Sequence, residues 1–250
     1  MKSTHFSRIR SLGQAEFRQF LRNRTLITMM ILPMALALMI NRAYPDHAAT
    51  GAAVSVDYLI QFVLLFSTYY PILSIITARR DEKVLKRLRV GELTDPDILI
   101  SLAVPAVFSS LAVVGLSAAA LFLLGSPLPD NPAPLGIALI LGIPLSWGLA
   151  LLTSTITPNA EGAQITSMPI VIVIMLSPAP TRLAFPDTIA EVIGYSPFAA
   201  ISDLIHLGWS ESTISLIGSD DLLRTLLLLI AWVLLCCWGG IRFMKWNNDR

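Results

Sequence analysis

Charged side chains are scarce in this sequence. Asp, Glu, Lys and Arg make up 14% of its 250 residues, whereas a soluble domain carries about 25%. Hydrophobic residues make up 54%, and the mean hydropathy is +0.68. The net charge of +1 leaves no excess of basic residues for a nucleic-acid partner. The composition argues against a soluble domain and is typical of a membrane protein.

Residues that bind metals or phosphates are also sparse. The two cysteines, Cys236 and Cys237, are adjacent in an apolar run, where neighbouring side chains of a helix point apart and do not readily form a disulfide. We expect both to be reduced and to face lipid or another helix. The three histidines are scattered, so no cluster has the spacing of a metal site. No Gly-Lys pair occurs, which excludes a GxxxxGKS/T phosphate-binding loop, and no metal or cofactor is expected on this chain.

Long segments without charge organise the rest of the chain. They lie at 25–41, 58–78, 98–129, 131–160, 162–181 and 225–241. A helix of about 20 apolar residues crosses a bilayer, and a helix satisfies every backbone amide within its own segment. Turn-forming residues at 125–132 and 157–162 separate the third, fourth and fifth segments. The sequence therefore predicts six transmembrane helices, at 25–42, 57–78, 96–124, 134–156, 161–180 and 222–243.

The placement of Lys and Arg predicts the orientation. With six spans, the segment before Thr25, the 79–97 loop, the 157–162 loop and the C-terminal tail lie on one side. That side holds 15 of the 18 basic residues, and the other side holds only Arg42, Arg182 and Arg224. Basic loops stay in the cytoplasm. We expect a multi-pass protein of the cytoplasmic membrane with both termini inside.

The residues before the first span have the pattern of an amphipathic helix, at 4–23. At 100° per residue, one narrow face contains the apolar residues Phe6, Ile9, Phe17 and Phe20. Basic residues lie on the opposite side, among them Arg18 and Arg22. This arrangement favours a helix lying in the membrane interface, as a topology anchor or as a contact for a cytoplasmic partner. A polar, basic segment this long is not expected to be a cleavable signal peptide.

The stretch from Arg79 to Asp97 holds 11 charged residues in 19 positions. Acidic residues come first and basic residues follow, an order that suits the helix dipole, and Gly91 is a plausible stop. Val84, Leu85 and Leu88 form a small apolar patch among these charged residues. The sequence predicts a short cytoplasmic helix at 80–91 that docks on a soluble protein, and its docking residues are Asp81, Glu82, Lys83, Val84, Leu85, Lys86, Arg87, Leu88 and Arg89.

Two segments resemble the membrane subunit of type-2 ABC exporters: SRIRSLGQAEFRQFLRNRTLI before the first span and ARRDEKVLKRLRVGEL after the second. The resemblance implies that the 80–91 helix is a coupling helix that transmits ATP-driven motion. It implies two copies of a soluble ABC ATPase that bind ATP and Mg, together with a second permease subunit, identical or related. Two short outer helices at 186–208 are similar to the re-entrant pair of that family.

Together these features predict an all-α integral membrane protein. It forms one transmembrane domain, 1–250, with six transmembrane helices, an N-terminal interfacial amphipathic helix, a cytoplasmic coupling helix and a short outer re-entrant helix pair. The first outer loop, 43–57, is too short for an added domain. The expected function is that of a permease subunit moving a hydrophobic or amphipathic substrate (a drug, an antibiotic or a lipid) across the cytoplasmic membrane. Membrane lipid is the other expected partner.

The resemblance also suggests a substrate route along the second and fifth helices. Its candidate residues are Gln61, Thr68, Tyr69, Gln164, Ser167 and Met168. The alternative is that these polar side chains form hydrogen bonds between packed helices, as is common in membranes.

Three other functions compete with the permease. An intramembrane enzyme would use Ser196 and His206, but Phe198 stands where the GxSxG pattern needs its last glycine. Ser196 and Pro197 are instead expected to be the cap and the first position of an outer helix. An ion-coupled secondary transporter needs carboxylates inside the membrane. We interpret Asp57 and Glu161 instead as interface residues at the ends of helices. A non-transporting scaffold or sensor would have no ATPase partner.

Overall fold

The computed structural model describes residues 24–44, 48–82, 95–159, 161–209 and 222–244, and all of the secondary structure in these ranges is helical. The all-α prediction is confirmed. The interfacial helix at 4–23 lies outside the described residues, and so does most of the predicted coupling helix, from Lys83 to Arg89.

The helices are α2 (Arg24–Arg42), α3 (Ala48–Val63), the π-helical turn η1 (Leu64–Tyr69), α4 (Tyr70–Asp81), α6 (Asp95–Leu123), α7 (Ala133–Ile156), α8 (Ala163–Thr166), α9 (Met168–Leu176), α10 (Ala179–Leu183), α11 (Asp187–Gly194), α12 (Pro197–His206) and α13 (Leu222–Phe243).

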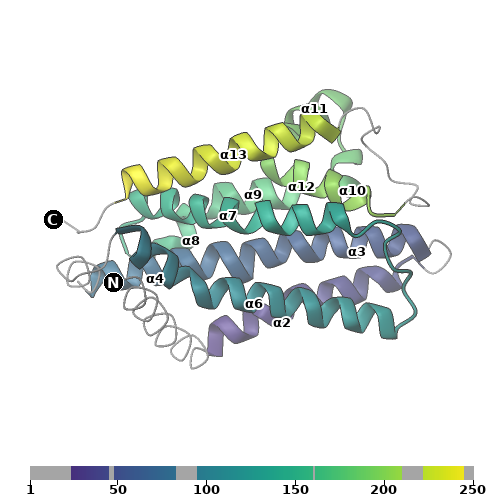
Figure 1. Cartoon of the computed structure of the whole chain (residues 1–250), viewed down its shortest axis with the longest axis horizontal. Coiled ribbons are helices and arrows are strands. Elements are labelled where there is room, and N and C mark those ends of the chain that lie inside the picture. Colours follow the sequence, from purple (N-terminus) through teal and green to yellow (C-terminus); the bar gives the residue numbers. More distant parts are fainter. Residues whose placement is uncertain (1–23, 45–47, 83–94, 160, 210–221, 245–250) are drawn as a thin grey trace, which may run out of the picture.

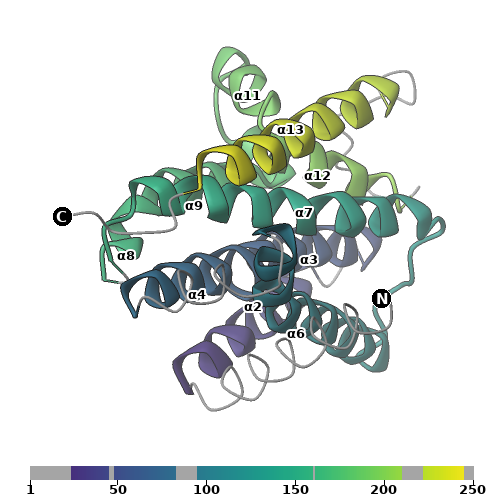
Figure 2. The same ribbon diagram turned by 60° about the vertical axis from the view of Figure 1, so that its left-hand side comes forward.

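The long helices lie side by side along the long axis of the molecule (Figure 1). Helix α13 packs on α7, α7 packs on the continuous run α3–η1–α4, and α2 and α6 cover the other side of that run. The turned view keeps the same order (Figure 2). We call the end with α8 and the last turn of α4 the inner end, and the end with α10–α12 the outer end, after the orientation predicted from the basic residues.

Four described helices are long and apolar enough to cross a membrane: Ala48–Asp81, Asp97–Leu123, Ala133–Ile156 and Leu222–Phe243. Helices α11 and α12 are bent by 97° and would add a fifth span if the pair counted as one. The apolar parts of the first and fifth predicted spans are shorter, Ile31–Arg42 and Ala163–Leu176. The count of six spans therefore stays a prediction.

The second span is the centre of the bundle. Of its most apolar window 78% is buried, compared with 22% for Leu222–Phe243. The helix begins at Ala48, so most of the predicted outer loop at 43–57 is helical. It continues to Asp81, past the predicted end at 78, which makes Arg80 and Asp81 part of the span and not of a separate helix.

A π-helical turn interrupts this span at Leu64–Tyr69, directly before Pro71. Proline has no backbone N–H, so the carbonyl of Ser67 loses its usual donor four residues later. The Ser109 hydroxyl of α6 lies 3.4 Å from that carbonyl and 2.8 Å from the Ala106 carbonyl of its own helix, so it shares its proton between the two. The neighbouring helix therefore places a polar group beside the carbonyl that the proline leaves without its usual donor.

The fifth predicted span is broken. Helix α8 ends at Thr166 and α9 begins at Met168, with Pro169 in its first turn, and α9 ends at Leu176 and not at 180. A further short helix, α10, was not predicted from the sequence and precedes the outer pair. The predicted outer helices at 186–208 correspond to α11 and α12.

Glycines bring α7 and α13 into close contact. A Cβ on Gly148 would lie 2.6 Å from the backbone carbon of Cys236, and one on Gly240 would lie 2.7 Å from Cβ of Leu151. Small residues permit such approach between membrane helices. Both cysteines are free thiols at this contact, Cys236 buried and Cys237 half-buried, and Cys237 donates to the Pro144 carbonyl at 3.3 Å. Of the two surroundings predicted for the cysteines, lipid or another helix, the structure places both at a helix contact.

We expect Gly148→Ala to lower the free energy of unfolding by about 1–3 kcal/mol, because the added methyl group meets backbone atoms of α13 that cannot move away. Gly136→Ala on the same helix is the control, since nothing lies within 4 Å of a Cβ there. Melting temperatures of the two variants in the same detergent test the prediction. Equal melting temperatures would contradict the close contact.

Candidate functional site

The polar residues of the second span are buried and bound to other helices. Gln61, Thr68 and Tyr69 are each at most 1% exposed. Gln61 Nε2 donates to the Phe198 carbonyl of α12 at 2.7 Å. The hydroxyl groups of Thr68 and Ser110, on α6, lie 2.7 Å apart. Tyr69 donates to Thr153 of α7 at 3.0 Å. These side chains join the second span to three other helices within the chain.

The route candidates of the fifth span lie elsewhere. Gln164 and Met168 are exposed, Met168 by 55%. Ser167 is buried, and its hydroxyl donates to the Gln164 carbonyl at 3.1 Å. The structure therefore divides the six candidates into an internal set and a surface set and does not bring them together around one cavity. Their role in a substrate route stays a prediction.

Arg80 is the most buried cation at the inner end. Its side chain is 2% exposed and reaches from the last turn of α4 to the end of α7. Nη1 donates to the Ser154 carbonyl at 2.7 Å, and Nη2 donates to the Thr157 carbonyl. Pro158 cannot supply an amide to Ser154, so that carbonyl has no donor within its own helix. Arg80 therefore caps the C-terminal end of α7.

The same junction extends to α8. The Thr157 and Thr166 hydroxyl groups lie 2.8 Å apart, and Thr157 also bonds back to the Thr153 carbonyl. Asp81 and Glu82, the first two predicted coupling residues, directly follow Arg80, and Glu82 pairs with Arg79 at 3.1 Å. The segment that leads to the predicted coupling helix is thus tied to the end of α7 through the Arg80 guanidinium, and the end of α7 is tied to α8 through the Thr157 and Thr166 hydroxyl groups.

A second polar junction lies at the outer end, around Asp57. This carboxylate is completely buried, and its Oδ2 accepts three hydrogen bonds. The donors are the Ala179 amide at 3.1 Å, the Ser202 hydroxyl at 2.6 Å and Nε2 of His206 at 3.2 Å. The interpretation of Asp57 as an interface residue at a helix end is wrong. Helix α3 begins at Ala48, so Asp57 lies well inside it and joins α3 to α10 and α12.

Arg182 and Asp203 form a buried ion pair beside this junction. The two side chains are 5% and 8% exposed, and the guanidinium meets both carboxylate oxygens, with Nη1 to Oδ2 at 3.4 Å. A bidentate pair of this kind fixes the orientation of both groups, here of α10 against α12. Opposite charges thus compensate each other where the outer helices enter the bundle.

The geometry does not favour the intramembrane enzyme. The Ser196 hydroxyl accepts from the Ala199 amide at 3.1 Å, which confirms its role as the cap of α12, and lies 3.0 Å from the Ser177 hydroxyl. His206 binds Asp57 instead. Ser202, His206 and the Ala179 amide all contact the same oxygen of Asp57, so this oxygen is an acceptor shared by three donors. Among the described residues, no group of three His, Cys, Asp or Glu side chains could hold a metal ion.

Sequence reasoning missed Arg80, Asp57 and the Arg182–Asp203 pair as fixed points of the structure. One signal was available: each charged residue lies within or next to an apolar segment, where an unpaired charge is costly. Their partners are 74, 145 and 21 positions away in the sequence, however, and no local pattern connects them.

These features define an all-α membrane protein whose central second span is hydrogen-bonded at both ends to the helices around it. The sequence profile described as ABC-2 type transporter matches residues 7–179. The match covers more than half of the chain, so the protein belongs to the ABC-2 type transporter family and is a permease component of an ABC transporter. A search of curated proteins found no match.

Proposed function

We propose that this chain is the permease subunit of an ATP-binding cassette exporter and moves a hydrophobic or amphipathic substrate out of the cytoplasm. The chain has no phosphate-binding loop of its own, so a separate ATPase must bind ATP and Mg. A second permease subunit would complete the pathway. Two copies of the same permease would pair through the same surface of each, as is typical of symmetric oligomers.

Apart from the family match, the observation that supports this proposal is the junction at Arg80. An ATPase that pulls on residues after Asp81 would act on the end of α4. Arg80 connects that end to the carbonyl groups of α7, and Thr157 connects α7 to α8. A force that the ATPase applies at the inner end would therefore move the second, fourth and fifth predicted spans together, as alternating access requires.

Purification of the tagged chain from its native membrane in mild detergent tests the partner. We expect a stoichiometric soluble ATPase to copurify with measurable ATP hydrolysis. Leu85→Asp combined with Leu88→Asp should abolish copurification, because two carboxylates would replace the apolar docking patch at a cost of several kcal/mol. Expression and membrane insertion of the variant serve as the control. A preparation without ATPase would favour the scaffold or the secondary transporter.

The orientation is tested by cysteine labelling in a background without Cys236 and Cys237. We expect Lys86→Cys to react from the cytoplasmic side and Asp130→Cys from the outside, because the basic residues predict this topology. Labelling of both positions from the same side would contradict it. Positions 86 and 130 lie on either side of the third predicted span, 96–124, so the same experiment tests whether that helix crosses the membrane.

A further inference from the structure

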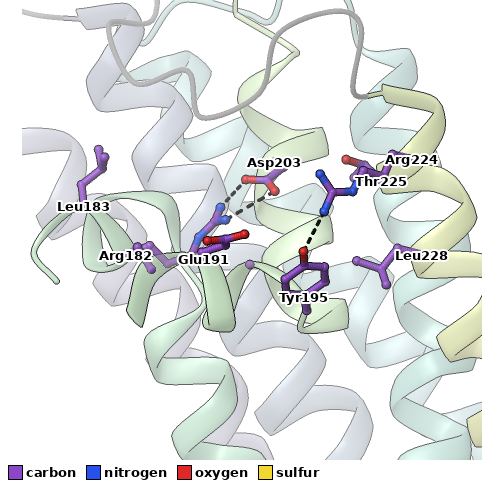
Figure 3. A pocket seen from close by; sticks show the side chains of 10 residues that line it. Arg182, Leu183, Glu191, Tyr195, Asp203, Arg224, Thr225 and Leu228 are labelled. Carbon is purple, nitrogen blue, oxygen red and sulfur yellow. Dashed lines mark hydrogen bonds and ion pairs between the residues drawn. The ribbon is translucent and has the colours of Figure 1, made fainter. Parts of the chain in front are cut away.

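A pocket of about 280 Å³ lies at the outer end, between α10–α12 and the first turns of α13 (Figure 3). Its polar lining consists of Arg182, Glu191, Tyr195, Asp203, Arg224 and Thr225. All of these residues follow residue 179, where the match to the family profile ends. The pocket has no part in the coupling path through Arg80, so its function has to be inferred from its own chemistry.

One side of the pocket is suited to an anion. The Arg224 guanidinium lies 5.4 Å from the centre of the Tyr195 ring and donates to the Tyr195 hydroxyl at 3.1 Å. Trp232 of α13 donates to the Tyr195 carbonyl at 3.2 Å, which holds that ring in place. The Thr225 hydroxyl follows Arg224 on the same helix. A phosphate oxygen entering here would find a charged donor and a neutral donor side by side.

The cation on the opposite side is buried and not fully paired. Arg182 is 5% exposed, and its Nη atoms bind Asp203, but Nε has no hydrogen-bond partner within the described residues. This Nε atom is itself buried and both Nη atoms face Asp203, so the exposed Arg224 is the cation open to a ligand. Figure 3 shows the Arg182 side chain reaching across the pocket toward Asp203.

Glu191 is, with Asp203, one of the two acidic residues that line the pocket. It is exposed on α11 and, within the described part of the chain, forms no ion pair. Two arginines and two acidic residues line the pocket, so the formal charges cancel. A neutral pocket with separated charges matches a ligand that carries both signs better than it matches a simple anion.

Apolar surface adjoins the polar lining. Leu183 in the wall is 57% exposed, and Val192 of α11 and Leu227 of α13 are 69% and 58% exposed. The pocket is at the first turns of a membrane-spanning helix, which is the level of lipid headgroups. A ligand bound here would have its polar part in the pocket and its apolar part along these side chains.

We propose that this pocket binds the zwitterionic headgroup of an outer-leaflet phospholipid. The phosphate lies against Arg224 and Thr225, the ammonium lies against Glu191, and the acyl chains follow the exposed apolar faces of α11 and α13. The proposal rests on the membrane location of the chain and on the orientation predicted from its basic residues, and not on the identity of its cargo.

The test uses the full chain purified in detergent and titrated with short-chain phosphatidylethanolamine. Its melting temperature is measured against lipid concentration, because a ligand of the folded state raises it by mass action. Phosphatidylglycerol with the same chains carries the phosphate without the ammonium. We expect phosphatidylethanolamine to stabilise the protein at about tenfold lower concentration than phosphatidylglycerol, since one charge-assisted contact is missing in the latter.

Three variants and a control locate the effect. Glu191→Gln and Arg224→Gln should each raise the half-saturating concentration of phosphatidylethanolamine about tenfold. Asp187→Asn, exposed on the same helix but outside the pocket, should leave it unchanged. Gly194→Leu should abolish the effect by filling the pocket, since a Cβ there has Arg182 Nη1 at 3.9 Å as its nearest neighbour. Equal stabilisation by both lipids, or unchanged titrations of the Glu191 and Arg224 variants, would overturn the proposal.

Discussion

Replacing Arg80 by alanine is expected to uncouple ATP hydrolysis from transport and to destabilise the protein by about 3 kcal/mol. The guanidinium makes two charge-assisted hydrogen bonds to carbonyl groups at the end of α7, and each is worth about 1.5–3 kcal/mol. Its removal leaves the Ser154 carbonyl without a donor, because Pro158 has no N–H. It also removes the two hydrogen bonds that join the last turn of α4 to the end of α7.

The measurement combines the melting temperature of the variant with ATPase activity of the complex in lipid. Arg79→Ala is the matched control, since its ion pair with the exposed Glu82 contributes only about 0.2–1 kcal/mol. Arg80→Lys should give an intermediate result, because an ammonium reaches the carbonyl groups as a point charge without the fork geometry. If Arg80→Ala matches the wild type in both measurements, the junction does not transmit motion.

Asp57→Ala is expected to be the most destabilising single substitution at the outer end. The carboxylate oxygen Oδ2 accepts from Ala179, Ser202 and His206. Without it the buried Ser202 and His206 donors would lose this acceptor, whereas the Ala179 amide keeps the Ser202 hydroxyl at 2.9 Å. A loss of about 3–5 kcal/mol follows from the unpaired polar groups. The expected fall in melting temperature is about 10 °C.

Asp57→Asn separates the charge from the hydrogen bonds. The amide oxygen keeps one acceptor in the same place, so we expect a loss of only about 1–2 kcal/mol. Asp187→Ala, on the exposed face of α11, should melt within about 1 °C of the wild type because surface changes rarely exceed 0.5 kcal/mol. Equal melting temperatures for Asp57→Ala and Asp57→Asn would show that the three hydrogen bonds contribute little.

The elements that the sequence predicted well are those governed by hydropathy over many consecutive residues. Helix α7 spans Ala133–Ile156 and α13 spans Leu222–Phe243, close to the predicted 134–156 and 222–243. Ser196 caps α12 as expected, because a cap depends on residues three positions apart. Such features are local, so the order of side chains along the chain is enough to define them.

The second span shows where local patterns fail. Residues 48–56 are alanine, valine, glycine, serine and threonine, and the charged Asp57 separates them from the charge-free segment that defined the predicted span. In the structure they pack closely: Gly51 would bring a Cβ within 2.8 Å of the Tyr44 side chain, and Ala52 and Ala53 are buried. Small residues in a membrane bundle indicate close helix contact rather than a turn, and this can be read only when the neighbouring helix is known.

The polar residues of that span show the same limit. Gln61, Thr68 and Tyr69 were predicted to line a route, and the fold places them in hydrogen bonds with α12, α6 and α7. The residue types indicate that a polar partner is needed inside the bundle. They do not indicate whether that partner is a substrate, a second subunit or another helix of the same chain.

By itself, the sequence determined that this is an all-α membrane protein, and it pointed to the permease family, because hydropathy and charge order are properties of the linear chain. Only the tertiary structure decided that Arg80 closes the end of α7 and that Asp57 joins α3 to α10 and α12. It alone also placed Arg182, Glu191 and Arg224 around one pocket. A buried charge is stable only beside its partner, and the fold decides which distant residue that partner is.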